Sequence, residues 1–358
     1  MNHLSFPAPV DDLHDAALAQ RLQHRLDNKT KPVGALGRLE ALALRVGLIL
    51  GSEVPVLDRP QMLVCAADHG LTARGVSAYP GDVTWQMVQN FLAGGAAVSV
   101  LARQHGLALT VVDCGVAREL APQPGLLVRR LGPGTADALD GPAMSAGQCA
   151  EAIANGGEIV RDLPGNALLL GEMGIGNSSS AALLLARLTG QDIDACTGAG
   201  TGLDAAGQAR KRAVLREVLA RHEQATAPLD ALAALGGFEI ATLVGAVLQA
   251  ARERRVIVVD GFIASAAVLV AHALQPAVVQ RCVAAHGSAE PGHALMLRAL
   301  GLTPLLQLDM RLGEGSGAAL AWPLLESACR ILREMASFES AGVSRKDGTP
   351  STPEGAGA

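Results

Sequence analysis

Glu314 is the first candidate for chemistry, because it is a single carboxylate between Gly313 and Gly315 in the segment DMRLGEGSGAALAW, residues 309–322. A glutamate close to the start of a helix is stabilised by the helix dipole, and glycine nearby is ordinary turn chemistry. Alternatively, the two glycines let a ligand approach the backbone, and the carboxylate faces a pocket and accepts a proton. The segment alone leaves both interpretations open.

A glycine-rich stretch at residues 171–184, GEMGIGNSSSAALL, is suited to binding an anion. Gly174 and Gly176 permit close approach, Asn177 and Ser178 supply donors, and the helix that follows would present free backbone N–H groups to a phosphate. The stretch lacks the Gly-Lys-Ser/Thr of a Walker A loop and the spacing of a GxGxxG dinucleotide fingerprint. A strand-to-helix turn with a polar cap explains the same residues without a ligand.

A similar arrangement recurs at residues 196–215, CTGAGTGLDAAGQARKRAVL, where Gly200 and Gly202 precede a helix that carries Lys211. A lysine at such a position is usually solvated, but beside a glycine loop it can also reach an anion. The segment VIVVDGF has only one acidic residue, Asp260, where loops that bind a magnesium–diphosphate donor have two. No carboxylate cluster has the spacing of a metal site, so we expect neither a metal nor a cofactor.

These candidate residues follow a repeated pattern of elements. An apolar run of strand length ends in a polar or glycine-rich turn, and a helix comes next. Continuous apolar strands that alternate with helices predict an α/β fold with a doubly wound, mainly parallel, Rossmann-like sheet. Ligands bind such sheets beyond the carboxyl ends of the strands, although any one polar residue there could be a helix cap instead. The polar residues at this edge are Asp68, His69, Asp113, Glu172, Asp260, His286, Ser288 and Glu314.

The two ends of the chain lack the strand pattern. Residues 1–55 and 320–338 are helical in pattern and are expected to form a small helical domain, whereas residues 56–319 form the α/β domain. Residues 339–358 have almost no apolar content, which predicts a disordered tail.

The composition restricts both the core and the partners. The 358 residues are 49% hydrophobic but only 2% aromatic, and 41 are glycine, so the core must consist of closely packed Ala, Val and Leu. The net charge is −5 and no long basic run occurs, which argues against nucleic acid as a partner. No apolar run reaches the ~18 residues of a membrane span, and the start of the chain lacks a signal-peptide core. We therefore expect a soluble, cytoplasmic protein in which most of the six separate cysteines are buried.

Several long segments occur together in one order: TKPVGALGRLE, ADHGLTARGVSAYP, VTWQMVQNFLAGGAAVSVLAR, GEMGIGNSSSAALL, VIVVDGFIASAA and RLGEGSGAAL. From about residue 10 to 335 the chain resembles the nicotinate-nucleotide–dimethylbenzimidazole phosphoribosyltransferases. The resemblance implies transfer of phosphoribose from nicotinate mononucleotide to 5,6-dimethylbenzimidazole, which gives α-ribazole 5′-phosphate and nicotinate for the lower ligand of cobalamin. It also implies a homodimer and a small helical domain built from both chain ends.

The resemblance also assigns site residues. The catalytic base of the family falls on Glu314, and its benzimidazole pocket falls on Tyr79, Gln86 and Leu312. The nucleotide side falls on Glu172, Gly174, Gly176, Asn177, Gly200, Gly202 and Lys211, with Ser178 beside them and with Asp260 and Gly261 as weaker matches. Two alternatives stay open: a nucleotide-binding sensor without turnover, and an enzyme of this class with a different azole, purine or phenolic acceptor.

Overall fold

The computed structural model describes residues 9–200 and 202–344. Contacts within the chain divide it into two units. Within the described residues, one contains residues 9–11 and Arg59–Ala321, and the other contains Asp12–Asp58 and residues 322–344. The domain limits expected from the sequence, 1–55 plus 320–338 and 56–319, differ from these units by a few residues at the two internal boundaries and in placing residues 9–11 in the helical domain.

The first unit is built on a six-stranded sheet with the strand order β3-β2-β1-β4-β5-β6, and every neighbouring pair is parallel. The chain extends the sheet from β1 towards β3 and then returns to extend it from β4 towards β6. The order therefore reverses between β1 and β4, and the predicted doubly wound fold is confirmed. The strands are β1 (Gln61–Ala67), β2 (Ala108–Gly115), β3 (Leu126–Val128), β4 (Ala167–Met173), β5 (Val256–Val259) and β6 (Cys282–Ala284), with a separate parallel pair, β7 (His286–Gly287) and β8 (Leu306–Gln307).

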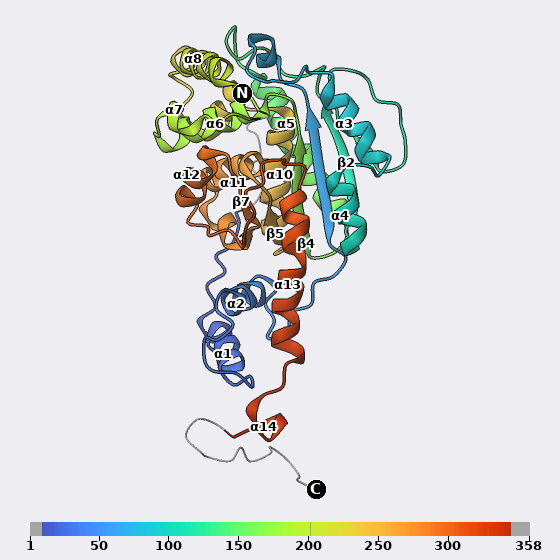
Figure 1. Cartoon of the computed structure of the whole chain (residues 1–358), viewed down its shortest axis with the longest axis vertical. Helices are drawn as coiled ribbons and strands as arrows, with labels where there is room; N and C mark the ends of the chain where they lie inside the picture. Colours follow the sequence, from blue (N-terminus) through green and yellow to red (C-terminus); the bar gives the residue numbers. More distant parts are fainter. Residues whose placement is uncertain (1–8, 201, 345–358) are drawn as a thin grey trace. The chain divides into compact units, whose positions relative to one another are not determined.

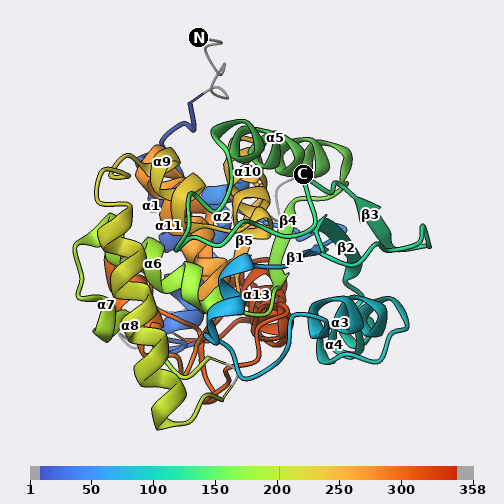
Figure 2. The same cartoon turned by 90° about the horizontal axis from the view of Figure 1, so that it is seen from above.

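Helices cover both faces of the sheet, which is why central strands such as β1 (QMLVCAA) and β5 (VIVV) are fully buried and, apart from Gln61, apolar. Figure 2 shows α5 and α10 on one side of the sheet and α3 and α4 on the other. The helices of this unit are η1 (Gly70–Arg74), α3 (Val83–Leu92), α4 (Ala97–His105), α5 (Ala146–Asp162), α6 (Asn177–Thr189), α7 (Ile193–Cys196), α8 (Ala205–Arg221), α9 (Pro228–Leu235), α10 (Phe238–Arg252), α11 (Phe262–Leu274), η2 (Pro276–Arg281), α12 (Pro291–Ala299) and the start of α13 (Ser316–Glu334).

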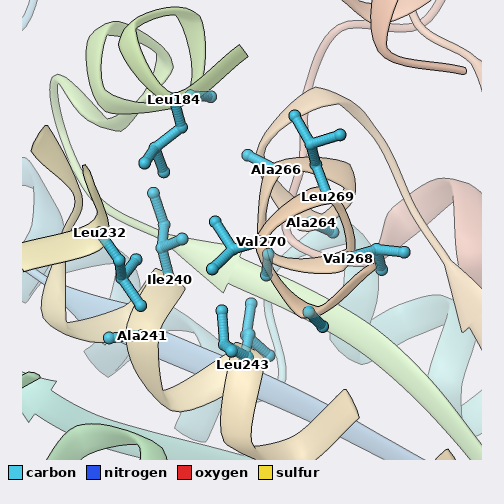
Figure 3. Packing of buried hydrophobic residues seen from close by; sticks show 14 of the residues in the cluster. Leu184, Leu232, Ile240, Ala241, Leu243, Ala264, Ala266, Val268, Leu269 and Val270 are labelled. Atoms are coloured by element: carbon cyan, nitrogen blue, oxygen red, sulfur yellow. The ribbon is translucent and has the colours of Figure 1, made fainter. Parts of the chain in front are cut away.

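The core of the first unit uses small side chains, as the composition predicts. Figure 3 shows Leu184 of α6, Leu232 of α9, Ile240 of α10 and Val270 of α11 gathered in one cluster. The helices α5 and α10 are in backbone contact at Gly156. The approach is so close that a Cβ atom there would overlap the carbonyl group of Thr242. With few aromatic side chains available, close approach of helices provides much of the burial. All six cysteines are buried, where the sequence predicted burial for most of them.

The second unit joins segments from the two ends of the chain (Figure 1). It contains α1 (Ala16–Asp27), α2 (Arg38–Leu50), the greater part of α13 and α14 (Phe338–Ala341). Leu22 and Leu26 of α1 are fully buried, and the Lys29 ammonium donates to the carbonyl oxygen of Met335 at 2.5 Å. No helix in the described ranges is long and apolar enough to cross a membrane.

The prediction of disorder from residue 339 onward is wrong for the first residues of that segment. Helix α14 begins inside the ordered part and includes residues 339–341. Ser337 and Ser340 cap its start by exchanging side-chain and backbone hydrogen bonds, and Gly342 ends it in the left-handed conformation. The prediction considered only apolar content and missed these two caps. The rest of the predicted tail, residues 345–358, lies outside the described residues.

Candidate active site

A cavity of about 350 Å³ lies at the carboxyl edge of the sheet, where the sequence analysis expected ligands to bind a parallel sheet. Its walls come from the segments that follow β1, β4, β5, β7 and β8. Ten of the residues proposed from the sequence line it: Tyr79, Glu172, Gly174, Gly176, Asn177, Ser178, Gly200, Gly261, Leu312 and Glu314. Gln86, Gly202, Lys211 and Asp260 are not among its lining residues. A second cavity, of about 440 Å³ between α5, α9 and α10, contains none of the proposed residues.

Glu314 has a left-handed backbone, with φ of 67° between Gly313 at 84° and Gly315 at 92°. For a residue other than glycine this conformation is strained by about 1–3 kcal/mol and persists only where the surroundings enforce it. Glu314 is 5% exposed and lies two residues before α13 begins. The interpretation of Glu314 as an ordinary first-turn helix carboxylate therefore does not describe its conformation or its burial.

Asp260 holds the loop that carries Glu314 in its conformation. Its two carboxylate oxygens accept hydrogen bonds from the backbone N–H groups of Gly315, at 3.2 Å, and Ala318, at 2.9 Å. Burial raises the pKa of Asp260, while His286 and these N–H groups oppose the rise. Asp260 was proposed as a nucleotide contact, but the structure places it behind the cavity wall, where it caps α13 and fixes the loop.

The carboxyl group of Glu314 is poised to exchange a proton near neutral pH. Burial raises its pKa to about 7, the backbone N–H of Val98 opposes the rise, and the charge of Asp260 adds to it. Its Oε2 atom has no hydrogen-bond partner among the described residues. A buried carboxylate with a free oxygen and a pKa near the working pH has the properties of a general base.

Glu172, at the end of β4, is a second carboxyl group with a shifted pKa. Burial raises its pKa to about 8; the amide of Asn177, which donates to its Oε2, opposes the rise, and the charges of Asp260, Glu239 and Glu314 add to it. At neutral pH Glu172 is therefore mainly protonated and can donate a hydrogen bond to a ligand oxygen. Glu314 and Glu172 thus both titrate well above an ordinary carboxyl group and line the same cavity.

The anion-binding candidates meet at the start of α6. Gly176 caps this helix with a φ of 92°, and Gly176, Asn177 and Ser178 line the cavity. The N–H groups of Asn177 and Ser179 donate to the carbonyl oxygens of Gly174 and Gly176, so a phosphate here would meet the helix dipole and the remaining N–H groups of this turn. Lys211 is 1% exposed, and its ammonium donates to the Ser178 hydroxyl at 2.8 Å. Burial lowers the pKa of Lys211 to about 8, while Glu290 opposes the change. Lys211 is thus a buried cation behind the turn, contrary to the usual interpretation of such a lysine as solvated.

The acceptor-side candidates are more open. Tyr79 and Leu312 are 53% and 56% exposed at the cavity, and Val83 and Met87 of α3 line it from the side. Gln86 lies on the same helix but is exposed and does not line the cavity. Sequence reasoning missed Val83 and Met87, although their spacing of four residues on one helix was a usable signal.

Glu290 is a further lining residue that the sequence did not indicate. Its Oε2, like the Nδ1 of the lining residue His286, is buried without a hydrogen-bond partner among the described residues. Such buried, unsatisfied atoms beside an empty volume are positioned to contact a bound molecule. The segment that contains both residues followed an apolar run, so the rule for strand ends located the segment but not Glu290 itself.

Comparison with known proteins supports one family. A family model described as "Phosphoribosyltransferase" matches residues 12–343. A protein of Variovorax paradoxus (strain S110), named nicotinate-nucleotide–dimethylbenzimidazole phosphoribosyltransferase, is 80% identical over 338 residues, covering 94% of this chain and 97% of its own. A protein of the same name from Cupriavidus necator is 56% identical, with coverage of 95% and 99%.

Solved structures agree with the sequence relatives. The crystal structure of CobT from Thermus thermophilus superposes with a TM-score of 0.89 at 45% identity and covers 92% of this chain and 99% of its own. A structure from the same organism, titled as the phosphoribosyltransferase, gives a TM-score of 0.88 at 44% identity, with coverage of 93% and 100%. This chain is therefore a phosphoribosyltransferase and belongs to the nicotinate-nucleotide–dimethylbenzimidazole phosphoribosyltransferase family.

Proposed function

We propose that the enzyme transfers the 5-phosphoribosyl group of nicotinate mononucleotide to 5,6-dimethylbenzimidazole, forming α-ribazole 5′-phosphate and nicotinate for the lower ligand of cobalamin. The observation that carries this proposal is the position of Glu314. It is a buried carboxyl group with an unpartnered oxygen, and it shares one cavity with a glycine-rich helix start suited to a phosphate. The names of the relatives at 80% and 56% identity support the choice of substrates.

The donor occupies the side of the cavity formed by the start of α6. Its phosphate lies against the turn from Gly174 to Ser178, with Gly200 opposite and the Lys211 charge behind Ser178. A Cβ atom on Gly200 would lie 2.9 Å from the Ser178 hydroxyl and 3.3 Å from the Lys211 ammonium, so these groups form one compact surface. Backbone N–H groups and a buried cation together favour a dianionic phosphate.

The bond that breaks joins the ribose C1′ to the pyridinium nitrogen of nicotinate. Its electron pair returns to the ring nitrogen, so the ring loses its positive charge and leaves without needing a proton. The bond that forms joins C1′ to a ring nitrogen of the benzimidazole. Positive charge develops on that ring, and the acidity of its other N–H rises until a carboxylate can take the proton. Glu314 accepts this proton, and Asp260 keeps its loop in place.

The acceptor lies on the other side, against Tyr79, Leu312 and the methylene and methyl groups of Val83 and Met87. A flat, apolar ring needs such a slot to orient it, together with one base that accepts the proton of its N–H group. Because Tyr79 and Leu312 are more than half exposed, the proposed homodimer would also explain what covers them. We further propose that the enzyme acts in the cytoplasm.

A direct assay tests this function. The enzyme is incubated with nicotinate mononucleotide and with dimethylbenzimidazole, other benzimidazoles, adenine or p-cresol, and the products are read by mass spectrometry. We expect α-ribazole 5′-phosphate and an equal amount of nicotinate with dimethylbenzimidazole. Nucleotide binding without any transfer would favour the sensor alternative, and faster transfer to a purine or phenol would replace the proposed acceptor.

A further inference from the structure

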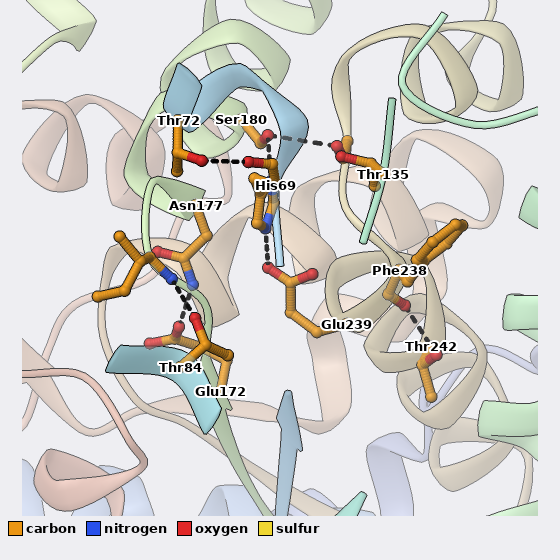
Figure 4. Close-up of polar contacts among 12 residues, drawn as sticks. His69, Thr72, Thr84, Thr135, Glu172, Asn177, Ser180, Phe238, Glu239 and Thr242 are labelled. Carbon is orange, nitrogen blue, oxygen red and sulfur yellow. Dashed lines mark hydrogen bonds and ion pairs between the residues drawn. The ribbon is translucent and has the colours of Figure 1, made fainter. Parts of the chain in front are cut away.

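His69 and Glu239 form a buried pair that does not line the cavity (Figure 4). His69 follows β1, and Glu239 is in the first turn of α10, 170 residues later in the chain. The Nε2 atom of His69 is 2.6 Å from Oε1 of Glu239, and the two side chains are 1% and 0% exposed. Burying two ionisable groups this completely costs a large desolvation free energy, which pairing only partly offsets, so we asked what the pair does for the site.

The hydrogen bonds around His69 define its charge. The Ser180 hydroxyl has one proton, which it donates to the carbonyl oxygen of Gly236 at 3.2 Å. Its oxygen can then accept from Nδ1–H of His69, also at 3.2 Å, while Nε2–H donates to the Glu239 carboxylate. These contacts suit an imidazolium cation, in which both ring nitrogens donate. Burial alone would lower the pKa of His69, but Glu239 and Asp68 together outweigh burial, and the pKa is raised from its ordinary value.

The pair lies directly behind the turn proposed to bind the donor. A Cβ atom on Gly174 would be 3.1 Å from Oε1 of Glu239 and 3.2 Å from Nε2 of His69. A Cβ atom on Gly176 would be 2.6 Å from the methyl group of Thr72, whose hydroxyl donates to the carbonyl oxygen of His69 at 2.7 Å. Both glycines of the turn are therefore in close contact with the segment that begins at His69.

Ser180 connects the same pair to the helix. It lies on α6, three residues after Asn177, at which the helix begins. Its contacts with His69 and with Gly236 join α6 to the segments before α3 and α10. A shift of any member would move the N–H groups at the start of α6 relative to the cavity.

We propose that His69, Glu239 and Ser180 are positioning residues that hold the Gly174–Asn177 turn and the start of α6 in the geometry that binds the donor phosphate. The proposal rests on the proposed function, because it takes this turn as the nucleotide side of the site. None of the three lines the cavity, so they act on donor binding through the turn and not on the transfer step.

Other charged groups face the pair and determine its pH dependence. Asp68 adds to the raised pKa of His69, and Glu239 adds to the raised pKa values of Glu172 and Cys65. The imidazolium form is complete at low pH and is lost as pH rises through the raised pKa of His69. Donor binding should therefore weaken as the pH rises through the raised pKa of His69, whereas proton transfer to Glu314 follows its own pKa near 7.

Four variants test the proposal: His69→Gln, Glu239→Gln and Ser180→Ala, with Thr242→Val as the matched control. Thr242 is equally buried on α10, and its hydroxyl bonds only to the carbonyl oxygen of Phe238 one turn earlier. We expect KM for nicotinate mononucleotide to rise about tenfold or more in the three network variants, the effect of one broken buried hydrogen bond. We expect kcat at saturating donor to stay within about threefold, and the control to match the parent in both constants.

Ser180→Ala removes only one oxygen atom, so it keeps the test valid if the charge variants do not fold. ¹⁵N NMR of the parent enzyme gives an independent readout: the His69 signal should titrate above the ordinary histidine pKa of about 6.5. Glu239→Gln should lower that titration. A His69 that titrates at or below the ordinary value, or folded network variants with an unchanged donor KM, would overturn the proposal. In that case Gly176→Val separates the two proposals: a raised donor KM retains the nucleotide site, and an unchanged KM removes both.

Discussion

The backbone carbonyl oxygen of Glu314 lies against Gly171 of β4, so closely that a Cβ atom on Gly171 would overlap it. The same β4 end brings the Glu172 carboxyl group next to Gly313, where a Cβ atom would be 2.5 Å from Oε1 of Glu172. The three consecutive left-handed residues Gly313, Glu314 and Gly315 are therefore pressed onto the strand that also carries Glu172. This contact explains why the base is surrounded by glycine: the loop must bend tightly and also lie flat on β4.

Gly171→Ala should displace the loop and separate Glu314 from the acceptor. A misplacement of about 1 Å can reduce the rate by about 100-fold, so we expect kcat to fall by between ten- and 100-fold while the fold is retained. The control is Gly141→Ala, because a Cβ atom on Gly141 meets no atom within 4 Å and its φ is ordinary. Steady-state kinetics with thermal unfolding of both variants measures the effect. Parent-like kcat in a folded Gly171→Ala enzyme would contradict the role given to this contact.

The sequence predicted the sheet and the edge at which the site lies, because both depend on local pattern. Apolar runs of strand length identified β1, β4 and β5, and the parallel-sheet rule placed the cavity at their carboxyl ends. Glu314 and the turn at Gly174 and Gly176 stood out because glycine beside polar residues is a local signal.

Properties that depend on tertiary contacts could not be predicted in this way. Lys211 is buried because its ammonium group lies against Ser178 and Gly200, which are not part of α8. The helix-capping role of Asp260 depends on Gly315 and Ala318, which lie 55 and 58 positions later in the chain. The partner of His69 is 170 residues away. Local spacing contains no information on such distances, so motif reasoning assigned Lys211 and Asp260 to the ligand and gave His69 no partner.

Donor binding should depend on the turn and on the cation behind it. Lys211→Ala removes a charge-assisted contact and should weaken binding of nicotinate mononucleotide by ~1.5–3 kcal/mol in titration calorimetry. Gly176→Val should weaken it further, because valine resists a φ of 92° and its Cβ would contact Thr72. Gly190→Val at the end of the same helix has a similar φ of 71° with no atom within 4 Å, so it reports backbone strain alone. Equal affinities for Gly176→Val and Gly190→Val would place the phosphate elsewhere.

Transfer should not require a divalent cation. The pyridinium leaving group already carries the positive charge that a metal would otherwise supply, and the proposed phosphate site uses N–H groups and Lys211. We expect the same initial rate with excess EDTA and with added magnesium, measured by release of nicotinate. A rate that EDTA abolishes and magnesium restores would show that the donor binds through a metal.

Glu314→Gln should test the base while preserving its shape. Glutamine keeps a side chain of the same size that can still hydrogen-bond, but it cannot accept the proton. We expect kcat to fall by ~10²-fold or more, the usual contribution of a general base. Calorimetry should give parent-like affinity for nicotinate mononucleotide, because Glu314 lies on the acceptor side of the cavity.

The pH profile distinguishes a missing base from a disturbed loop. The pKa of Glu314 is raised to about 7, so the carboxyl group is protonated and inactive well below that pH and ionised above it. In the parent enzyme kcat/KM should therefore rise with pH and reach half its plateau near pH 7. Glu314→Gln removes the titrating group, so its residual kcat/KM should not rise through this range, whereas Gly171→Ala should keep the rise at a lower plateau. A Glu314→Gln enzyme that turns over within a few-fold of the parent, with the same rise near pH 7, would assign both the proton transfer and the titration to another residue, and Glu172 would be the next to test.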